Sequence, residues 1–147
     1  MAKQKIKKEI NLNSSKEKVW NVLTADNYTR KWYAVFMEGT HAETDWQVGS
    51  KALFKDASGS GLIGKIVANK PAELLDIEYY GMLDKGVEDY DGPLAQSMKG
   101  GHEIYRLAPN NGQTTLSVEL DMPEEYYAMM STQWDDALKM IKELSEN

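Results

Sequence analysis

One acidic residue, Glu103, stands where a side chain could transfer protons. The residues around it alternate as in a β-strand, which puts Glu103 on the same face as Tyr105 and Leu107. The opposite face carries His102, Ile104 and Arg106, so the Glu103 face is the more apolar one and is expected to point inward. A carboxyl group in an apolar cavity would have a raised pKa and could act as an acid or a base.

The same carboxyl group has a plainer interpretation. Glu103 lies near the start of its strand, and because strand ends fray, its side chain could lie in water or pair with a lysine. On the sequence alone this second interpretation is preferred. Catalytic residues are therefore left unassigned, and a role for Glu103 inside a cavity is kept as a hypothesis.

Aromatic and methionine side chains could form the wall of a binding cavity. A tyrosine offers an apolar ring with one hydrogen-bonding hydroxyl, and a methionine adapts to irregular shapes. The candidate ligand-binding residues are Trp32, Tyr79, Glu103, Tyr105, Tyr127, Met130 and Trp134. A packed core explains the tyrosines and the methionine equally well. Trp134, like Trp20, lies on an apolar helical stripe, which favours a role in the core.

Several other chemistries lack the residues that they require. The chain has no cysteine, and His41 and His102 lie in separate segments, so we expect no metal site. Neither a serine-hydrolase elbow nor a phosphate-binding loop motif occurs. The glycine-rich residues 58–64 precede no helical pattern and are interpreted as a turn, and the acids between residues 88 and 91 lack the spacing of a calcium loop. We expect no cofactor.

Alternation and turn residues predict the elements that would position these side chains. Residues 3–12 alternate as a strand, and two short helices follow, the first introduced by Ser14 and Glu17 at capping-box spacing. Six more strands are expected, at residues 37–44, 50–55, 62–68, 74–80, 102–107 and 114–120. The connection 81–101 is longer than a hairpin loop and is interpreted as a lid that controls entry to a pocket.

The clearest helix is predicted over residues 124–145. Its apolar stripe consists of Tyr127, Met130, Trp134, Ala137, Leu138, Ile141 and Leu144. Asp121 is placed to cap the start of this helix. Strands followed by one long helix indicate an α+β fold with a curved antiparallel sheet wrapped around that helix, in the order β-α-α-β6-α. Function then depends on whether the space between sheet and helix is filled or hollow.

Size and charge narrow the classes of partner. A chain of 147 residues predicts a single domain over residues 1–147. The net charge of -6 opposes binding to nucleic acid, and no apolar run approaches the roughly 20 residues that membrane insertion requires. Lys3, Lys5 and Lys7 fit a solvated strand face that discourages edge pairing. The lack of cysteine and of an apolar leader favours a cytoplasmic location, and a monomer and a homodimer both remain open.

The order of these features resembles the helix-grip fold of the START/Bet v 1-like (SRPBCC) superfamily. The nearest branch is the one related to the C-terminal domain of the activator of Hsp90 ATPase (AHSA1-like). The residues that carry the resemblance are 14–20, Leu23, Thr24, Trp32, 48–50, Phe54, 64–66, Pro71, 74–80, 114–116 and 134–138. Together they span nearly the whole chain. The resemblance implies a cavity between sheet and helix, whose relatives bind lipids, sterols or polyketide-like molecules, assist chaperones, or occasionally catalyse cyclisation and hydrolysis.

Three functions follow as hypotheses. The first is a binding protein, rather than an enzyme, that holds a small and largely apolar molecule in this cavity. The second is an enzyme that uses Glu103, with a tyrosine hydroxyl, for acid-base catalysis, and it requires a buried carboxyl opening into a pocket beside such hydroxyls. The third is a chaperone-interaction domain, which requires an exposed patch and a filled core.

Overall fold

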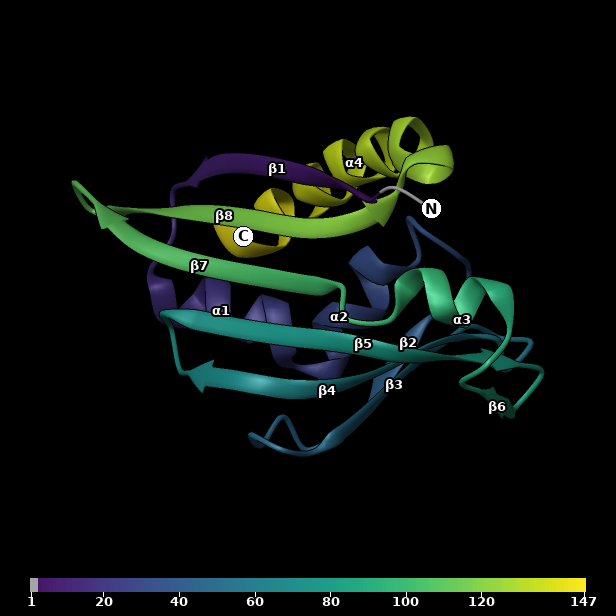
Figure 1. The fold of residues 1–147 in the computed structure, drawn as a ribbon. Helices are drawn as coiled ribbons and strands as arrows, with labels where there is room; N and C mark the ends of the chain where they lie inside the picture. Colours follow the sequence, from purple (N-terminus) through teal and green to yellow (C-terminus); the bar gives the residue numbers. More distant parts are fainter. Residues whose placement is uncertain (1–2) are drawn as a thin grey trace.

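The computed structural model describes residues 3–147 and has an α+β helix-grip fold (Figure 1). Met1 and Ala2 lie outside the described residues. The strands are β1 (Lys3–Leu12), β2 (His41–Glu43), β3 (Lys51–Lys55), β4 (Gly61–Lys70), β5 (Leu74–Asp84), β6 (Val87–Asp89), β7 (His102–Asn110) and β8 (Gln113–Pro123). The helices are α1 (Lys16–Thr24), α2 (Asp26–Tyr33), α3 (Pro93–Met98) and α4 (Tyr127–Glu146), with a short 3-10 turn, η1 (Glu124–Tyr126), before α4.

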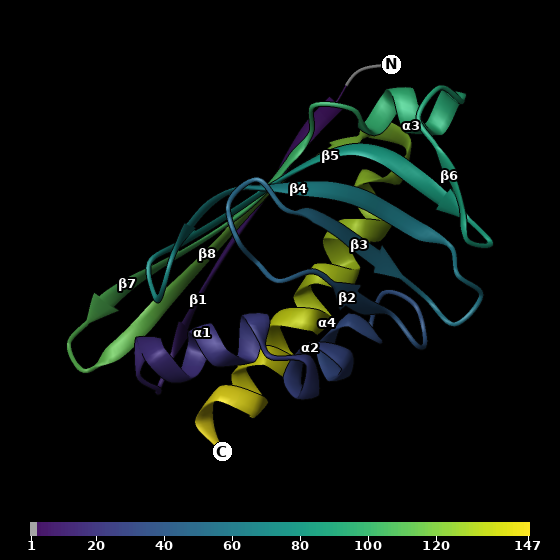
Figure 2. The same ribbon diagram turned by 90° about the horizontal axis from the view of Figure 1, so that it is seen from below.

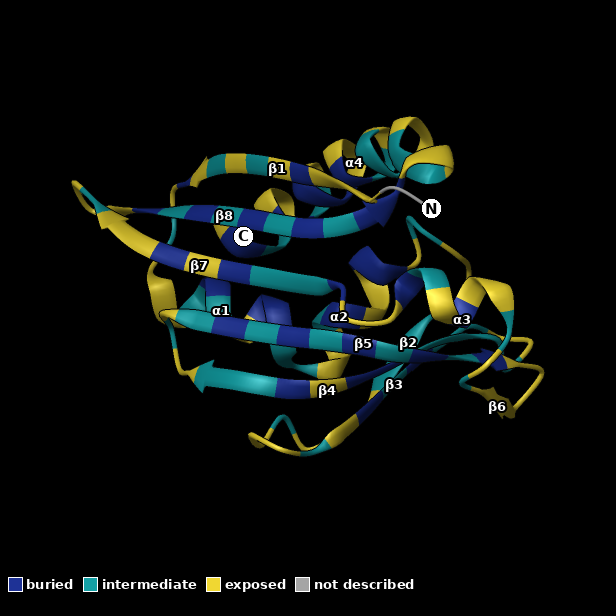
Figure 3. Cartoon of the chain, in the orientation of Figure 1, coloured by how far each residue is buried: buried dark blue, intermediate teal, exposed yellow. Residues whose placement is uncertain are grey.

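Over residues 3–147 the strands form one antiparallel sheet of eight. Its order is β1-β8-β7-β5-β4-β3-β2, and β6 pairs with β5 outside this path. The sheet curves, and its concave side faces α4 together with α1 and α2 (Figure 2). Buried residues alternate with more exposed ones along β5 and β8, so one face of each strand meets the helices (Figure 3).

The curvature has a local cause in β4. The register between β4 and β5 shifts between Ile63 and Gly64 and again between Ile66 and Ala68. Such bulges bend a strand and increase its twist. A Cβ atom at Gly64 would lie 2.9 Å from the Ile77 side chain, so the bend brings the two strands too close for a larger residue.

Helices α1 and α2 are the two predicted short helices, and together they form an elbow after β1. The cap of α1 is Ser15 and not Ser14, because the Ser15 hydroxyl accepts a hydrogen bond from the Lys18 amide at 3.1 Å. The indole nitrogen of Trp32 donates to the Val22 carbonyl at 2.9 Å, which ties α2 back onto α1. This bond fixes the Trp32 ring at the concave side of the sheet.

The predicted faces of β1 are confirmed. Ile6 and Leu12 are fully buried, whereas Lys3, Lys5 and Lys7 are exposed. Lys5 forms an ion pair with Asp121 of the neighbouring β8 at 3.1 Å. The three lysines therefore lie on the solvated face of the sheet, as the alternation predicts.

The segment 81–101 differs from the prediction. It is not one loop, because β5 continues to Asp84, β6 pairs back onto it, and α3 then packs against β5 with Ala95 and Met98 buried. Seven strands rather than six therefore follow the elbow, and a short helix interrupts them. Gly92 and Pro93 suit the N-terminus of a helix. The helix is easy to miss in the sequence because it has only six residues and no apolar stripe.

Asp121 also differs from the prediction, since it does not cap the long helix. Strand β8 runs on to Pro123 opposite Lys3, which keeps Asp121 inside the sheet. Its carboxylate accepts a hydrogen bond from the His102 amide at 3.0 Å. Within the described residues no helix is both long and apolar enough to cross a membrane.

Candidate ligand-binding site

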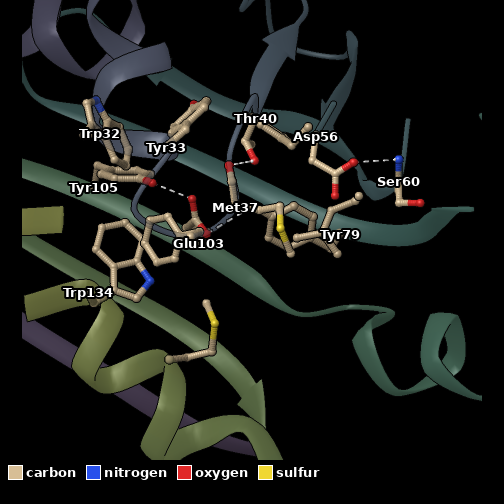
Figure 4. Close-up of a pocket in the computed structure, with 15 residues that line it drawn as sticks. Trp32, Tyr33, Met37, Thr40, Asp56, Ser60, Tyr79, Glu103, Tyr105 and Trp134 are labelled. Carbon is tan, nitrogen blue, oxygen red and sulfur yellow. Dashed lines mark hydrogen bonds between the residues drawn. The ribbon is translucent and has the colours of Figure 1, made fainter. Parts of the chain in front are cut away.

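A pocket of about 210 Å³ lies between the concave face of the sheet and the N-terminal half of α4 (Figure 4). Its other walls come from α2 with the segment that follows it, and from the turn between β3 and β4. The lining residues are Trp32, Tyr33, Phe36, Met37, Thr40, Phe54, Asp56, Ser60, Gly61, Leu62, Tyr79, Glu103, Tyr105, Met130 and Trp134. Most of these side chains are aromatic or aliphatic.

One wall consists of aromatic rings in mutual contact. The Trp134 ring lies 6.0 Å from Trp32 and 6.0 Å from Tyr105, measured between centroids, and 5.1 Å from Phe36 in an edge-to-face arrangement. These separations are typical of favourable aromatic pairs. Three separate elements, α2, β7 and α4, supply the rings other than Phe36, so the wall is held from several sides.

A second group of rings lies toward β3. Phe54 packs edge-to-face against Tyr33 at 6.2 Å and against Tyr79 at 6.0 Å. The backbone of Tyr79 forms two hydrogen bonds with the segment after α3. Its amide donates to the Gly101 carbonyl at 2.8 Å, and its carbonyl accepts from the Gly100 amide at 2.9 Å. The segment before β7 thus holds Tyr79 in place.

The carboxyl group of Glu103 faces the pocket between these two groups of rings. It accepts one hydrogen bond from the Tyr79 hydroxyl at 3.1 Å and one from the Tyr105 hydroxyl at 2.5 Å. No ion pair to Glu103 occurs among residues 3–147. Glu103 therefore faces inward, as the alternation predicts, and pairs with no lysine in this part of the chain, while the residue as a whole is half-buried.

Burial raises the pKa of Glu103, and the hydrogen bonds from Tyr105 and Tyr79 oppose this shift only in part. Burial, and next to it the nearby Glu103 charge, raises the pKa of both tyrosine hydroxyls well above their ordinary value. Burial likewise raises the pKa of Tyr33. All three hydroxyls therefore remain protonated at neutral pH, and those of Tyr79 and Tyr105 donate to Glu103.

The opposite end of the pocket is more polar. Asp56 and Ser60 come from the turn between β3 and β4, where the Asp56 carboxylate accepts bonds from the Ser58 amide at 2.8 Å and the Ser60 amide at 3.2 Å. Hydrogen bonding from Ser58 lowers the pKa of Asp56. The Asp56 side chain thus stabilises the turn that forms this wall. Thr40 donates its hydroxyl proton to the Met37 carbonyl at 2.6 Å.

Six of the seven predicted binding residues line this pocket: Trp32, Tyr79, Glu103, Tyr105, Met130 and Trp134. The exception is Tyr127, which packs half-buried against the core in the first turn of α4. Residues 81–101 contribute no lining side chain, so the predicted lid does not cover the pocket. Binding of a ligand by the six residues remains a prediction.

Sequence reasoning did not find several lining residues. Phe36, Met37 and Thr40 lie in the irregular segment between α2 and β2, where the sequence predicts only a poor strand from residue 37. No periodic pattern marks such a segment. Two other lining residues carried a usable signal. Tyr33 directly follows Trp32, and Phe54 is an aromatic residue of the predicted strand 50–55.

The described residues contain no cluster of three metal-ligating side chains. His41 and Glu43 form a pair at 3.0 Å, apart from the pocket lining. His102 instead pairs with Asp76 at 2.7 Å on the face of the sheet opposite Glu103.

These features define a class of protein: a helix-grip domain with a small, mostly apolar pocket between sheet and helix. Residues 13–146 match the model of the family described as activator of Hsp90 ATPase homolog 1-like protein. The chain belongs to this AHSA1-like family. No curated protein matches the sequence.

Solved structures share the fold at low sequence identity. The Aha1 dimer from Colwellia psychrerythraea has a TM-score of 0.71 and 20% identity, over 97% of this chain and 96% of that one. MLL2253 from Mesorhizobium loti has a TM-score of 0.74 and 16% identity, over 96% of both chains. CalU16 from Micromonospora echinospora has a TM-score of 0.68 and 18% identity, over 95% of this chain and 73% of that one.

Proposed function

We propose that this protein binds a small, largely apolar molecule in the pocket between the sheet and α4. The observation that carries the proposal is a ligand-sized space of about 210 Å³ whose wall is mostly apolar, with the Glu103 carboxyl group between its aromatic rings and the Asp56 carboxyl group at its polar end. Binding sites for small molecules commonly combine an apolar wall with a few polar groups that orient the ligand. An apolar cavity of about 150 Å³ is large enough for benzene, so this pocket suits a compound of one or two rings.

The charge of the site favours neutral or cationic ligands. Glu103 is the acidic group in the middle of the pocket, and its two donors, Tyr79 and Tyr105, are neutral. An anionic ligand would meet the Glu103 carboxylate in surroundings of low polarity, where like charges repel strongly. We therefore expect affinity for uncharged aromatic compounds and little affinity for their carboxylate derivatives.

Two neighbouring methionines on α4 provide a matched test. Met130 lines the pocket, whereas Met129 is 55% exposed. A Met130→Trp variant fills the pocket and should abolish binding of one- and two-ring aromatic compounds in calorimetric titrations. Met129→Trp adds the same side chain outside the pocket and should bind them as the unaltered protein does. The proposal fails if no such compound binds the unaltered protein and native mass spectra show no small molecule retained by it.

Acid-base catalysis is a second candidate function, and a specific observation favours it. Glu103 has a raised pKa, opens into the pocket and lies within hydrogen-bond distance of two tyrosine hydroxyls. This is the arrangement that proton transfer to a bound molecule would require. A bound compound that the unaltered protein converts, and that Glu103→Gln binds without converting, would establish catalysis. Recovery of every bound compound unchanged would exclude the reactions tested.

A chaperone-interaction role has less support from the structure. It predicts a filled core, whereas a pocket lies between the sheet and α4. The description of the family and the dimeric Aha1 relative concern other proteins. Retention of this protein by Hsp90 in a pull-down, with a change in Hsp90 ATPase activity, would bring that role back.

A further inference from the structure

One buried donor in the pocket wall lacks an acceptor. The Trp134 side chain is 2% exposed, and its indole nitrogen has no hydrogen-bond partner within residues 3–147. An indole nitrogen can only donate, and buried donors in proteins are nearly always bonded. Two other indoles show the usual pattern: Trp32 donates to the Val22 carbonyl at 2.9 Å and Trp46 to the Thr24 carbonyl at 3.1 Å.

The surroundings of Trp134 explain why the protein itself supplies no acceptor. The neighbouring side chains of Trp32, Phe36 and Tyr105 present aromatic rings. The Tyr105 hydroxyl is directed to Glu103, whose carboxyl group also receives Tyr79. In Figure 4 the nitrogen of Trp134 lies on the edge of the ring that is turned away from Trp32, and the residue lines the pocket.

We propose that Trp134 donates a hydrogen bond to the ligand, so that the ligand is a neutral one- or two-ring aromatic compound with an acceptor such as a ketone, lactone or lactam oxygen. This inference rests on the proposed binding function and goes beyond it by naming the ligand class and the orienting residue. A neutral acceptor satisfies the indole donor without placing a negative charge near Glu103. The acceptor edge of the ligand thus faces α4.

A pair of matched compounds tests this inference. Indane is a bicyclic hydrocarbon, and 1-indanone has the same ring frame with one carbonyl oxygen. Loss of a single hydrogen bond between neutral groups weakens binding by up to about tenfold. Trp134→Phe should therefore weaken 1-indanone about tenfold in calorimetric titrations and change the affinity for indane by less than about twofold. Trp20→Phe, which alters a tryptophan outside the pocket lining, should change neither.

Nuclear magnetic resonance gives an independent readout on the unaltered protein. In a spectrum of the indole N–H groups, 1-indanone should move the Trp134 signal downfield, and indane should not. This measurement decides the question even if Trp134→Phe fails to fold, because it needs no variant once the signal is assigned through contacts with neighbouring protons.

The outcomes separate the two proposals. If neither indane nor 1-indanone binds the unaltered protein, the proposed binding of one- and two-ring compounds fails, and this inference fails with it. If both compounds bind but Trp134→Phe weakens them equally, or the Trp134 signal responds equally to both, the pocket binds ligands and only the role of the indole donor is overturned.

Discussion

The two halves of α4 meet the sheet in different ways. Toward its C-terminus, α4 carries the fully buried Ile141, and α1 and β1, which contact α4, carry the fully buried aliphatic residues Val19, Val22 and Leu12. We call this region the filled end. The Asn13 amide donates to the Glu146 carboxylate at 2.8 Å, which brings this end of α4 to the junction of β1 and α1. Toward the N-terminus of α4 lies the pocket, which we call the hollow end.

The difference shows how one helix can serve both stability and binding. Branched aliphatic side chains interdigitate closely, and the filled end can reach the packing density typical of protein interiors. Large flat rings held from α2, β7 and α4 leave space between them at the hollow end. We infer that the filled end carries most of the stability, and that the hollow end can accept a guest without unfolding the protein.

The largest expected effect comes from damaging the filled end. Ile141→Ala should lower the free energy of unfolding by about 2–5 kcal/mol, because it removes a buried side chain and leaves a cavity. Urea unfolding measures this loss, and Met129→Ala, on an exposed position of the same helix, should stay within about 0.5 kcal/mol of the unaltered protein. A loss under 1 kcal/mol for Ile141→Ala would contradict a tightly packed filled end.

The next largest effect is expected at the bend in β4, where Gly64 lies against Tyr79 of the hollow end. A Cβ atom at Gly64 would lie 2.9 Å from Ile77 and 3.2 Å from the Tyr79 ring. Gly64→Ala should therefore cost about 1–3 kcal/mol of stability through overpacking and displace Tyr79 from Glu103. Urea unfolding tests the first effect, and an altered affinity for aromatic probes tests the second. Unchanged stability would mean that the sheet relaxes around the added methyl group.

The sequence predicted the filled end better than the hollow end. The alternation in β1 and the stripe of α4 follow directly from burial. Of the seven predicted stripe residues, Trp134, Ala137, Leu138 and Ile141 are buried, and the other three are partly buried. A pocket depends instead on how rings from distant elements pack, which no local pattern records. The inward direction of Glu103 and its place beside Tyr105 followed from alternation, but its second donor, Tyr79, required the register that aligns β7 with β5.

A smaller effect depends on pH and tests the polar part of the hollow end. Because burial raises the pKa of Glu103 in the folded state, ionisation of this group opposes folding. The stability associated with neutral Glu103 is fully present below the unfolded-state pKa near 4.3 and is lost as pH rises through the folded-state pKa. Glu103→Gln should remove this loss, so its stability relative to the unaltered protein should increase with pH over that window. Urea unfolding between pH 4 and pH 8 measures the difference, and parallel curves would contradict a raised pKa of Glu103.

The smallest effect should come from widening the pocket itself. Met130 borders empty space on one side, so Met130→Ala removes fewer packing contacts than Ile141→Ala does. We expect a loss of about 0.5–1 kcal/mol, well below the usual cost of truncating a fully buried methionine. The same variant should bind two-ring compounds at least as well as the unaltered protein in calorimetric titrations. A stability loss equal to that of Ile141→Ala would mean that Met130 closes the space, and the contrast between the two ends of α4 would then disappear.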